Sequence, residues 1–560
     1  MRRVSRSERT MIEEKNRHCC LIPYAFLVGI GIRLLMGLQG FDYVDMGFCM
    51  TFYQNIFSHP EAMPFYFNYY LTGLIGGLWQ AMLGDWGLQG FRLLDVLART
   101  AAIWMLYLTF RDFIPSKRIA ALTVLLAFLF PTYIITFHYN TSTLLLMSVA
   151  IWLFSSAYRQ KSMLLLFAAG VALGITLFAR SVNLAMLPLI ALPLLNLDNH
   201  SLKKRIVATV VHAGGLLTGL AVVWTLLAAT HQSGYFLDGL NEAFAFFNTN
   251  ESEAINTHTS GNIIWSYLVS WKNVLAQAVA LLVICSIYVY ATRTEGIKNK
   301  ALKTVCIISL AVLTYTSLAY VTLLTVCLLL LVTAFCKGTI DKRILPALLY
   351  ATIGALLFPI GSDMGIARIF NHSAQLLVFP ATVCLTGVKA PAIKSLLPYG
   401  YACITLSAFA YLLFMPYEES EPRWKLTTMV QSKGLNVYTD SNKAAFYQDV
   451  IQKIHEYGQD SPTLLLANQS SELYYATGKQ PFTGSTQVYT YNGSMLHTQL
   501  AKQEKFYGHL PMVVFLKIEE SENETLARQE LRPWLAEKKY KRIYEDTNLI
   551  IYKSNYETSI

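Results

Sequence analysis

The amino-acid sequence predicts a polytopic α-helical membrane protein of about thirteen transmembrane helices, followed by a C-terminal soluble α/β domain. The first observation is composition: of 560 residues, 54% are hydrophobic and 14% are charged, and the mean hydropathy is +0.39. These values are too apolar for an ordinary soluble protein. The second is a series of long apolar runs before residue 415, and the third is a change of composition after it.

Thirteen apolar runs are long enough to be read as membrane-crossing helices. They cover residues 21–38, 92–110, 118–136, 141–157, 162–179, 183–197, 205–229, 273–292, 303–318, 320–336, 344–360, 373–388 and 395–414. Acidic residues in the N-terminal region, and the lack of a small-residue cleavage site after the first run, favour a retained helix over a cleaved signal peptide. The sequence therefore predicts a membrane domain over residues 1–415.

Lys and Arg collect in the short segments between alternate runs, as they do in cytoplasmic loops. This pattern predicts a cytoplasmic N-terminus if the glycine-rich run at 69–83 does not cross, so we interpret that run as interfacial or re-entrant. Residues 39–91, which we call the first loop, then lie outside, together with the 230–272 loop and the C-terminus. A bacterial inner (cytoplasmic) membrane with a periplasmic C-terminal domain is the preferred setting, since no eukaryotic targeting signal is recognised.

Residues 416–560 hold 18 of the 35 acidic residues and lack a spanning run. Short β-like stretches, such as "TLLLAN" and "MVVFLKI", alternate with helix-like stretches at 441–458 and 524–540. The pattern predicts a compact periplasmic α/β domain.

Two classes of function are disfavoured by composition. The net charge of +10 is scattered between apolar runs instead of forming a basic face, so no nucleic-acid partner is expected. The nine cysteines form no CxxC pair and fall mainly in apolar segments, which indicates buried hydrophobic side chains instead of a zinc site or disulfide framework.

The first loop concentrates acidic and aromatic residues directly after the first span. Its carboxylates include Asp42, Asp45 and Glu61, and His59 lies between them in the sequence. Aromatic residues are common at a membrane interface, but carboxylates among them are not explained in that way. Partial desolvation raises a carboxylate's proton affinity and suits it to general-base catalysis.

One acid falls within a predicted span. Asp95 lies three and four residues from Arg92 and Arg99. An acid inside the membrane is costly unless it is paired, so we interpret this group as an ion pair that holds helices together in preference to a catalytic site.

The first loop resembles that of GT-C class glycosyltransferases that use polyprenyl-phosphate sugars. It is most similar to the superfamily of protein O-mannosyltransferases and aminoarabinose lipid A transferases, in its bacterial membrane members. The resemblance is carried by "VDMGF", which keeps the acid at Asp45 but has Met46 in place of the family's Glu, and by "MPFYFNYYL". The segments "HYNTSTLLL" and "FARSVNLAMLPL" resemble later family stretches.

The resemblance implies an inverting hexosyl- or pentosyltransferase. It would transfer a sugar from a polyprenyl-phosphate-linked donor to a glycolipid, glycan or protein acceptor at the outer face of the inner membrane. Such a reaction needs a base for the acceptor hydroxyl and cationic groups for the departing phosphate. Asp45 is the first candidate base, with a loop-capping role as its alternative, and Asp42 is the second, with an Asx-turn role as its alternative.

Arg180 and Arg368 are the candidate phosphate ligands, because a guanidinium offers paired donors; both could instead snorkel to the interface. The remaining candidate substrate-binding residues are Glu61, His59, Tyr139, Asn140, Asp363 and His372. Solvated or structural roles are the alternatives for Glu61 and His59. No cofactor or metal is predicted, and a divalent cation between Asp45 and Asp363 is unsupported by ligand spacing. Membrane lipids complete the expected partners.

Two other readings stay open. A lipid-linked glycan polymerase or ligase would use a large external loop, for which the 230–272 loop is a candidate. A transporter or flippase of a lipid-linked glycan would be expected to show repeats and polar groups near the bilayer midplane, whereas the polar groups here gather at the outer edge.

Overall fold

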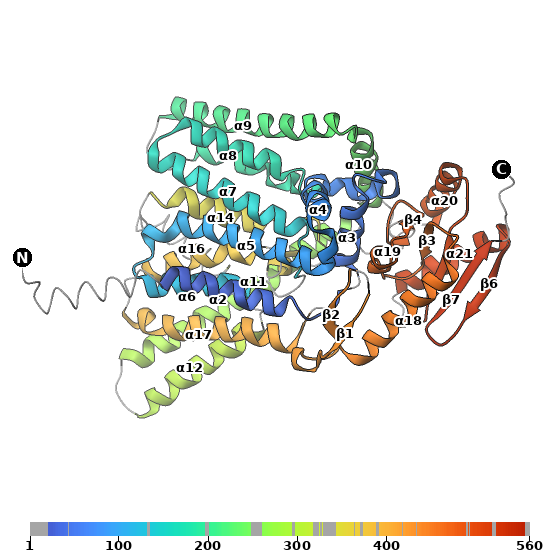
Figure 1. The fold of residues 1–560 in the computed structure, drawn as a ribbon. Helices are drawn as coiled ribbons and strands as arrows, with labels where there is room; N and C mark the ends of the chain where they lie inside the picture. Colours follow the sequence, from blue (N-terminus) through green and yellow to red (C-terminus); the bar gives the residue numbers. More distant parts are fainter. Residues whose placement is uncertain are drawn as a thin grey trace, which may run out of the picture.

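The computed structural model describes residues 21–554 except for short internal segments. The segments outside the description are 43, 131–134, 196–200, 248–259, 294–296, 317–342 (apart from 324 and 328), 363–364, 370–372, 388–390, 417, 433, 489–490, 492 and 518–521. A helical bundle is followed by a smaller α/β region at one end of it (Figure 1). The predicted span at 320–336 lies almost wholly outside the described residues.

The described part of the bundle contains helices of very different lengths. They are α2 (Leu21–Met36), α3 (Asp45–Asn55), η1 (Pro60–Ala62), η2 (Pro64–Tyr69), α4 (Tyr70–Leu83), η3 (Gly84–Trp86), α5 (Gly87–Phe110), η4 (Arg111–Phe113), α6 (Lys117–Leu129), α7 (Tyr139–Gln160), α8 (Met163–Thr176), η5 (Ser181–Leu194), α9 (Leu202–Ala229), α10 (Ser233–Phe247), α11 (Ser260–Arg293), α12 (Ile297–Thr316), α14 (Leu345–Leu357), η6 (Gly365–Arg368), α16 (Ala374–Gly387) and α17 (Pro391–Phe414).

Five stretches of helix in the described residues are long and apolar enough to cross a membrane. They are Pro64–Phe113, Tyr139–Gln160, Leu202–Ala229, Gly261–Arg293 and Lys394–Phe414. Shorter apolar helices, such as Met163–Thr176 and Ala374–Gly387, occupy other predicted spans. The apolar helices support a multi-pass membrane protein, while the number of thirteen spans stays a prediction.

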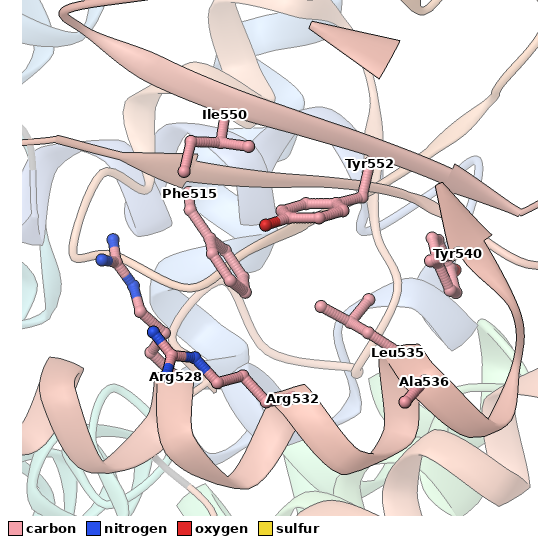
Figure 2. A pocket seen from close by; sticks show the side chains of 8 residues that line it. All are labelled: Phe515, Arg528, Arg532, Leu535, Ala536, Tyr540, Ile550 and Tyr552. Atoms are coloured by element: carbon pink, nitrogen blue, oxygen red, sulfur yellow. The ribbon is translucent and has the colours of Figure 1, made fainter. Parts of the chain in front are cut away.

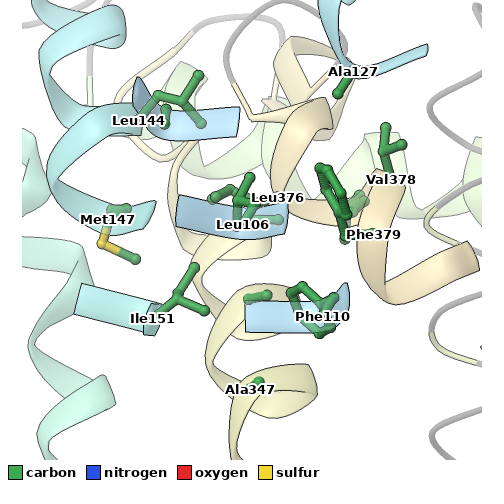
Figure 3. Packing of buried hydrophobic residues seen from close by; sticks show 14 of the residues in the cluster. Leu106, Phe110, Ala127, Leu144, Met147, Ile151, Ala347, Leu376, Val378 and Phe379 are labelled. Carbon is green, nitrogen blue, oxygen red and sulfur yellow. The ribbon is translucent and has the colours of Figure 1, made fainter. Parts of the chain in front are cut away.

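Apolar side chains from helices far apart in sequence form the centre of the bundle. Figure 3 shows Leu106 and Phe110 of α5 beside Leu144 of α7 and Phe379 of α16. The rings of Phe110 and Phe379 are stacked with centroids 6.3 Å apart. This packing buries the apolar faces of helices that are not neighbours along the chain.

Glycines bring α8 and α9 into backbone contact. A side-chain carbon added at Gly170 would lie 2.0 Å from the carbonyl oxygen of His212, and one added at Gly215 would lie 2.0 Å from that of Phe167. Gly174 and Gly219 repeat the contact one helical turn later. Small residues four apart are the usual means by which membrane helices approach closely.

The buried acid of α5 joins three helices. Asp95 is fully buried and accepts hydrogen bonds from Arg99 at 2.8 Å and from Arg33 of α2 at 3.2 Å. Thr141 of α7 donates to the same carboxylate at 2.5 Å. The predicted ion pair is therefore present, but Arg92 is not part of it: its guanidinium donates to the carbonyls of residues 37 and 40, because it lies where α2 ends.

The two ends of the bundle differ in charge. Gln39, just after α2, donates to the carbonyl of Arg423, so this end contacts the C-terminal region; we call it the domain end. At the opposite end, which we call the basic end, Arg159 of α7 pairs with Asp112 after α5 at 3.5 Å. Other bases near this end are Arg111, Lys117, Arg118, Lys161, Lys204 and Arg205. The first loop and the C-terminal region therefore share one end, with α3, α4 and α10 beside them (Figure 1).

The C-terminal region contains two sheets. A short antiparallel pair, β1 (Thr428–Val430) and β2 (Val437–Thr439), precedes a five-stranded sheet with the order β4-β3-β5-β7-β6. Its strands are β3 (Thr463–Leu466), β4 (Gln480–Pro481), β5 (Met512–Leu516), β6 (Tyr540–Glu545) and β7 (Leu549–Ser554). β3 is parallel to β4 and β5, whereas β7 is antiparallel to β5 and β6.

Alternate residues of this sheet face two separate cores. Val514 and Ile551 pack with α18 (Ser441–Tyr457), α19 (Glu472–Thr477) and the first loop. Val513 and Phe515 pack on the other face, with α20 (Gly493–Tyr507) and α21 (Glu522–Glu537). The predicted α/β character is confirmed, but the helix expected to reach residue 540 ends at Glu537, where Lys539 takes a left-handed conformation (φ 54°) and β6 begins.

Candidate active site

Asp42 caps the short helix that carries Asp45. Its carboxylate accepts hydrogen bonds from the backbone N–H groups of Val44 at 2.9 Å, Asp45 at 3.1 Å and Met46 at 3.2 Å. These donors are the groups that a helix leaves unpaired at its N-terminus. Burial and the negative charge of Asp45 raise the pKa of Asp42, while the backbone N–H donors oppose that shift. The contact with the N–H of Val44, two residues on, is that of an Asx turn, which is the alternative role given above for Asp42.

Asp45 is the first residue of α3 and is partly exposed, unlike Asp42. The negative charge of Asp45 interacts electrostatically with the hydroxyls of Tyr69, at the end of η2, and Tyr139, at the start of α7. Cys49 follows one helical turn after Asp45 and is buried. The structure therefore places the first candidate base next to two tyrosines from different parts of the chain.

Aromatic rings connect α3 with α7. Phe48 stacks on Tyr66, with centroids 4.8 Å apart, and also faces Tyr69 and Tyr139 at 6.1 and 6.2 Å. The rings of Tyr69 and Tyr139 are themselves stacked at 4.6 Å. Offset stacking of this kind favours a fixed relative position of the rings. Asp45 thus belongs to a helix that is packed firmly against the start of α7.

Arg180 lies over the Tyr139 ring of this stack. Its guanidinium carbon is 5.4 Å from the centroid of the Tyr139 ring, within the range of a cation–π interaction. It donates to the side-chain oxygen of Asn140 at 3.5 Å and to the carbonyls of Phe358 and Ile360 at 3.3 Å. The Asn140 side-chain N–H₂ is buried and has no hydrogen-bond partner within the described chain. A buried donor of this kind is costly unless another group accepts from it.

Arg368, at the end of η6, is a second cation near this cluster. Its positive charge interacts electrostatically with that of Arg180. Its Nε donates a hydrogen bond to the hydroxyl of Ser362 at 3.2 Å. The backbone N–H of Ile366 donates to Ser270 of α11 at 3.0 Å, so η6 is held against that helix. The two other candidates from this loop, Asp363 and His372, lie outside the described residues.

His59 and Glu61 form a separate pair on the first loop. Their side chains are 3.2 Å apart, and the exposed fractions are 47% and 23%. The charge of Glu61 acts on Tyr235 of α10 and Tyr507 of α20. The structure thus brings Asp45, Tyr139, Asn140, Arg180 and Arg368 into one neighbourhood, while this pair faces α10 and the C-terminal region.

The C-terminal region packs directly on the helix of Asp45, which sequence reasoning did not anticipate. A side-chain carbon at Gly47 would lie 2.1 Å from the backbone nitrogen of Glu472 in α19. Tyr66 bonds to Thr486 at 2.7 Å. Glu472 is fully buried, and burial together with the charge of Asp42 raises its pKa well above the ordinary value. No local pattern marks these residues, because each contact joins positions about 420 apart.

No group of three or more His, Cys, Asp or Glu side chains in the described ranges could hold a metal ion. Asp45 and Arg180 instead offer a carboxylate and a cation near the stacked rings of Tyr69 and Tyr139. A carboxylate can accept a proton from a hydroxyl, and a guanidinium can bind phosphate oxygens.

Comparison with solved structures gives distant likenesses. The chain is similar to the Archaeoglobus fulgidus oligosaccharyltransferase in complex with Zn and sulfate, with 14% identity and a TM-score of 0.49 over 95% of this chain and 73% of that one. It is also similar to the archaeal oligosaccharyltransferase AglB from Archaeoglobus fulgidus in complex with an inhibitory peptide and a dolichol-phosphate, with 12% identity, a TM-score of 0.48, and coverage of 98% and 75%.

The sequence comparisons are more specific. No curated protein sequence matches the chain significantly. Residues 70–228 match the family model of dolichyl-phosphate-mannose-protein mannosyltransferases. This segment runs from α4 to α9 and contains Tyr139, Asn140 and Arg180, whereas Asp42 and Asp45 lie before it. The match confirms the predicted resemblance to GT-C class glycosyltransferases: over residues 70–228 the chain is similar to the dolichyl-phosphate-mannose-protein mannosyltransferases.

Proposed function

We propose that this protein transfers a sugar from a polyprenyl-phosphate donor to a hydroxyl of a glycolipid, glycan or protein acceptor, with inversion at the sugar carbon. The observation that carries the proposal is the arrangement around Tyr139. Asp45 acts on its hydroxyl, and Arg180 lies over its ring with its guanidinium carbon 5.4 Å from the centroid. A base and a cation are the two groups that this transfer requires.

The proposed reaction is a single displacement. The acceptor oxygen attacks the anomeric carbon of the donor sugar, and the bond from that carbon to the phosphate oxygen breaks. Asp45 accepts the proton of the acceptor hydroxyl, and the lipid phosphate leaves with the bonding electron pair. Arg180 and Arg368 would bind the phosphate oxygens, because guanidinium groups stabilise the charge that develops there.

The buried Asn140 side chain supports a polar ligand in this cluster. Its oxygen is occupied by Arg180, but its N–H₂ group has no partner within the described chain. A phosphate or sugar oxygen would satisfy this donor and remove the cost of leaving it unpaired. Asn140 is therefore proposed to bind the donor headgroup beside Arg180.

We place the reaction at the outer face of a bacterial inner membrane, with the C-terminal region in the periplasm. Two features support this orientation. The first loop and the C-terminal region share the domain end, and Lys and Arg gather at the basic end, as expected for cytoplasmic loops. Reactive headgroups of lipid-linked donors lie at membrane-surface depth, which is where loop and helix-terminal residues can reach them.

The test is sugar transfer in proteoliposomes with radiolabelled polyprenyl-phosphate sugars and a panel of lipid and glycan acceptors. The Asp45→Asn variant removes the proposed base while keeping the side-chain size. We expect transfer to decrease by at least about 100-fold, the usual contribution of a general base, while donor binding persists. Asp85→Asn is the matched control, since Asp85 is an exposed acid of the same loop.

Three outcomes would contradict the proposal. Unchanged transfer by Asp45→Asn would exclude this residue as the base. Absence of transfer by the wild type, combined with movement of labelled lipid-linked glycan across the membrane, would favour the transporter alternative. Growth of a polymer on one lipid carrier would identify a glycan polymerase instead.

A further inference from the structure

A pocket of about 370 Å³ lies in the C-terminal region, between α21 and the sheet. It is lined by Phe515, Arg528, Arg532, Leu535, Ala536, Tyr540, Ile550 and Tyr552 (Figure 2). The residues come from one helix and from the adjacent strands β5, β6 and β7. Its size falls within the range of small-molecule sites.

The pocket lies on the sheet face that points away from the candidate active site. Phe515 belongs to the core formed with α20 and α21, whereas its neighbours Val514 and Leu516 belong to the core shared with the first loop. A ligand in this pocket would therefore bind separately from the donor. Substitutions here can be made without touching Asp45, Tyr139 or Arg180.

Two arginines give the pocket a positive charge. Arg528 and Arg532 are four residues apart on α21, and none of the eight lining residues is acidic. Like charges at this spacing repel each other and weaken a helix. Arg528 is held in place, since its Nη2 donates to the carbonyl of Leu516 at 2.9 Å and its guanidinium carbon lies 5.0 Å from the centroid of the Phe515 ring. An anionic ligand would accept charge-assisted hydrogen bonds from guanidinium groups at this wall of the pocket.

Aromatic rings form the other walls. Tyr552 contacts Phe515 with ring centroids 5.4 Å apart, and both rings face the pocket between the strands and α21 (Figure 2). Tyr540 is fixed by a hydrogen bond from its hydroxyl to the carbonyl of Pro511 at 2.9 Å. Rings of this kind offer flat apolar surfaces with a polar edge. That combination suits a ligand with both C–H faces and hydroxyl groups.

We propose that this pocket binds a saccharide that carries a carboxylate or phosphate group. Arg528 and Arg532 bind the anionic group, and Tyr552 and Tyr540 contact the sugar ring. The identification of this saccharide as part of the acceptor rests on the proposed transferase function. The binding site itself rests on the charge, the aromatic walls and the volume of the pocket.

The experiment is a ligand-observed NMR titration of the full-length protein in detergent micelles. The probes are a hyaluronan tetrasaccharide, which carries carboxylates, mannose 6-phosphate, which carries a phosphate, and neutral chitotetraose. Inorganic phosphate tests whether a simple anion is sufficient. The variants are Arg532→Gln, Arg528→Gln and Asp45→Asn, and Arg542→Gln is the matched control because Arg542 lies in the same region, is 60% exposed and is not among the pocket residues.

We expect an anionic saccharide to bind at least about tenfold more tightly than chitotetraose, and Arg532→Gln to remove most of that difference, because the substitution removes a charge-assisted hydrogen bond. Arg542→Gln and Asp45→Asn should bind like the wild type. The response to the carboxylate and the phosphate probe identifies which group the site accepts.

Equal binding of neutral and anionic saccharides, binding that survives both arginine substitutions, or equally tight binding of inorganic phosphate would overturn the proposal. Because binding is measured without turnover, its outcome is independent of the transfer assay. Saccharide binding without any transfer would support the pocket and contradict the transferase function. Transfer without saccharide binding would contradict only the pocket.

Discussion

The carboxylate of Asp42 accepts a hydrogen bond from the backbone N–H of Asp45 at 3.1 Å. Two acids that look equivalent in the sequence therefore have different surroundings: one is buried under the start of a helix, and the other is the first residue of that helix. Asp42 orients the backbone that carries Asp45. In the proposed reaction, Asp42 acts as a positioning residue and Asp45 as the base.

Replacing Asp42 separates these roles. Asp42→Ala removes the acceptor of three backbone N–H groups, and loss of a helix cap costs about 1 kcal/mol. Asp42→Asn keeps an acceptor oxygen, so its stability and its rate of transfer should be close to those of the wild type. Thermal unfolding in detergent and kinetic assays of the two variants provide the measurement. Inactivity of Asp42→Asn with an intact fold would show that the charge of Asp42 is itself needed.

The stability of the protein should depend on pH through Asp42. Burial, followed by the charge of Asp45, raises the pKa of this carboxyl, so the folded protein keeps the proton to higher pH than the unfolded chain. Protonated Asp42 therefore contributes fully to the free energy of unfolding below about pH 4, the usual pKa of an unfolded Asp. This contribution is lost as the pH rises above that value. The melting temperature of Asp42→Asn should therefore rise relative to that of the wild type as the pH is increased from 4 to 8. A constant difference would contradict the raised pKa.

Arg180 should matter through the geometry of its guanidinium. Arg180→Lys keeps a positive charge but loses the paired donors that now reach Asn140, Phe358 and Ile360. We expect kcat/KM for the donor to fall by about 10- to 100-fold, which corresponds to the loss of one charge-assisted hydrogen bond. Arg111→Gln, a half-exposed arginine at the basic end, is the control. If KM for the donor and kcat are both unchanged, Arg180 does not bind the phosphate.

The contact between α3 and α19 can be tested at Gly47. In Gly47→Ala the new side-chain carbon would lie 2.1 Å from the Glu472 nitrogen, so the C-terminal region must shift. Overpacking of this kind costs about 1–3 kcal/mol. Hydrogen exchange of residues 471–477 should increase and transfer should decrease. Gly31→Ala is the control because a side-chain carbon there meets no atom within 4 Å; equal effects of the two changes would argue against a specific contact.

The Asp95 network should be among the largest single contributions to stability. Asp95→Asn leaves Arg33 and Arg99, which are 1% and 3% exposed, without a counter-charge. Breaking one side of a buried ion pair costs about 3–5 kcal/mol. Thermal unfolding in detergent measures the loss. The exposed pair Glu421–Lys425 offers a comparison, since Glu421→Gln should change the melting temperature very little.

Much of the architecture could be predicted because its signals are local. Apolar runs predicted the apolar helices, and the short apolar stretch "TLLLAN" between helix-like segments predicted β3. The error at residues 538–540 arose because helix propensity continues past Glu537, whereas pairing of β6 with β7 decides the structure there. The ion pair at Asp95 was predicted from its spacing to Arg99, but Arg33, its second partner, is 62 positions away.

The sequence by itself determined the membrane character, the α/β nature of the C-terminal region and the concentration of acids and aromatic rings after the first helix. These properties can be read from the composition and the hydrophobic periodicity of short stretches of the sequence. Only the tertiary structure decided that Asp42 caps the helix of Asp45, that Arg180 lies over the ring of Tyr139, and that α19 packs against Gly47. These relationships join positions that are far apart along the chain, and they depend on how whole helices pack once their apolar faces are buried.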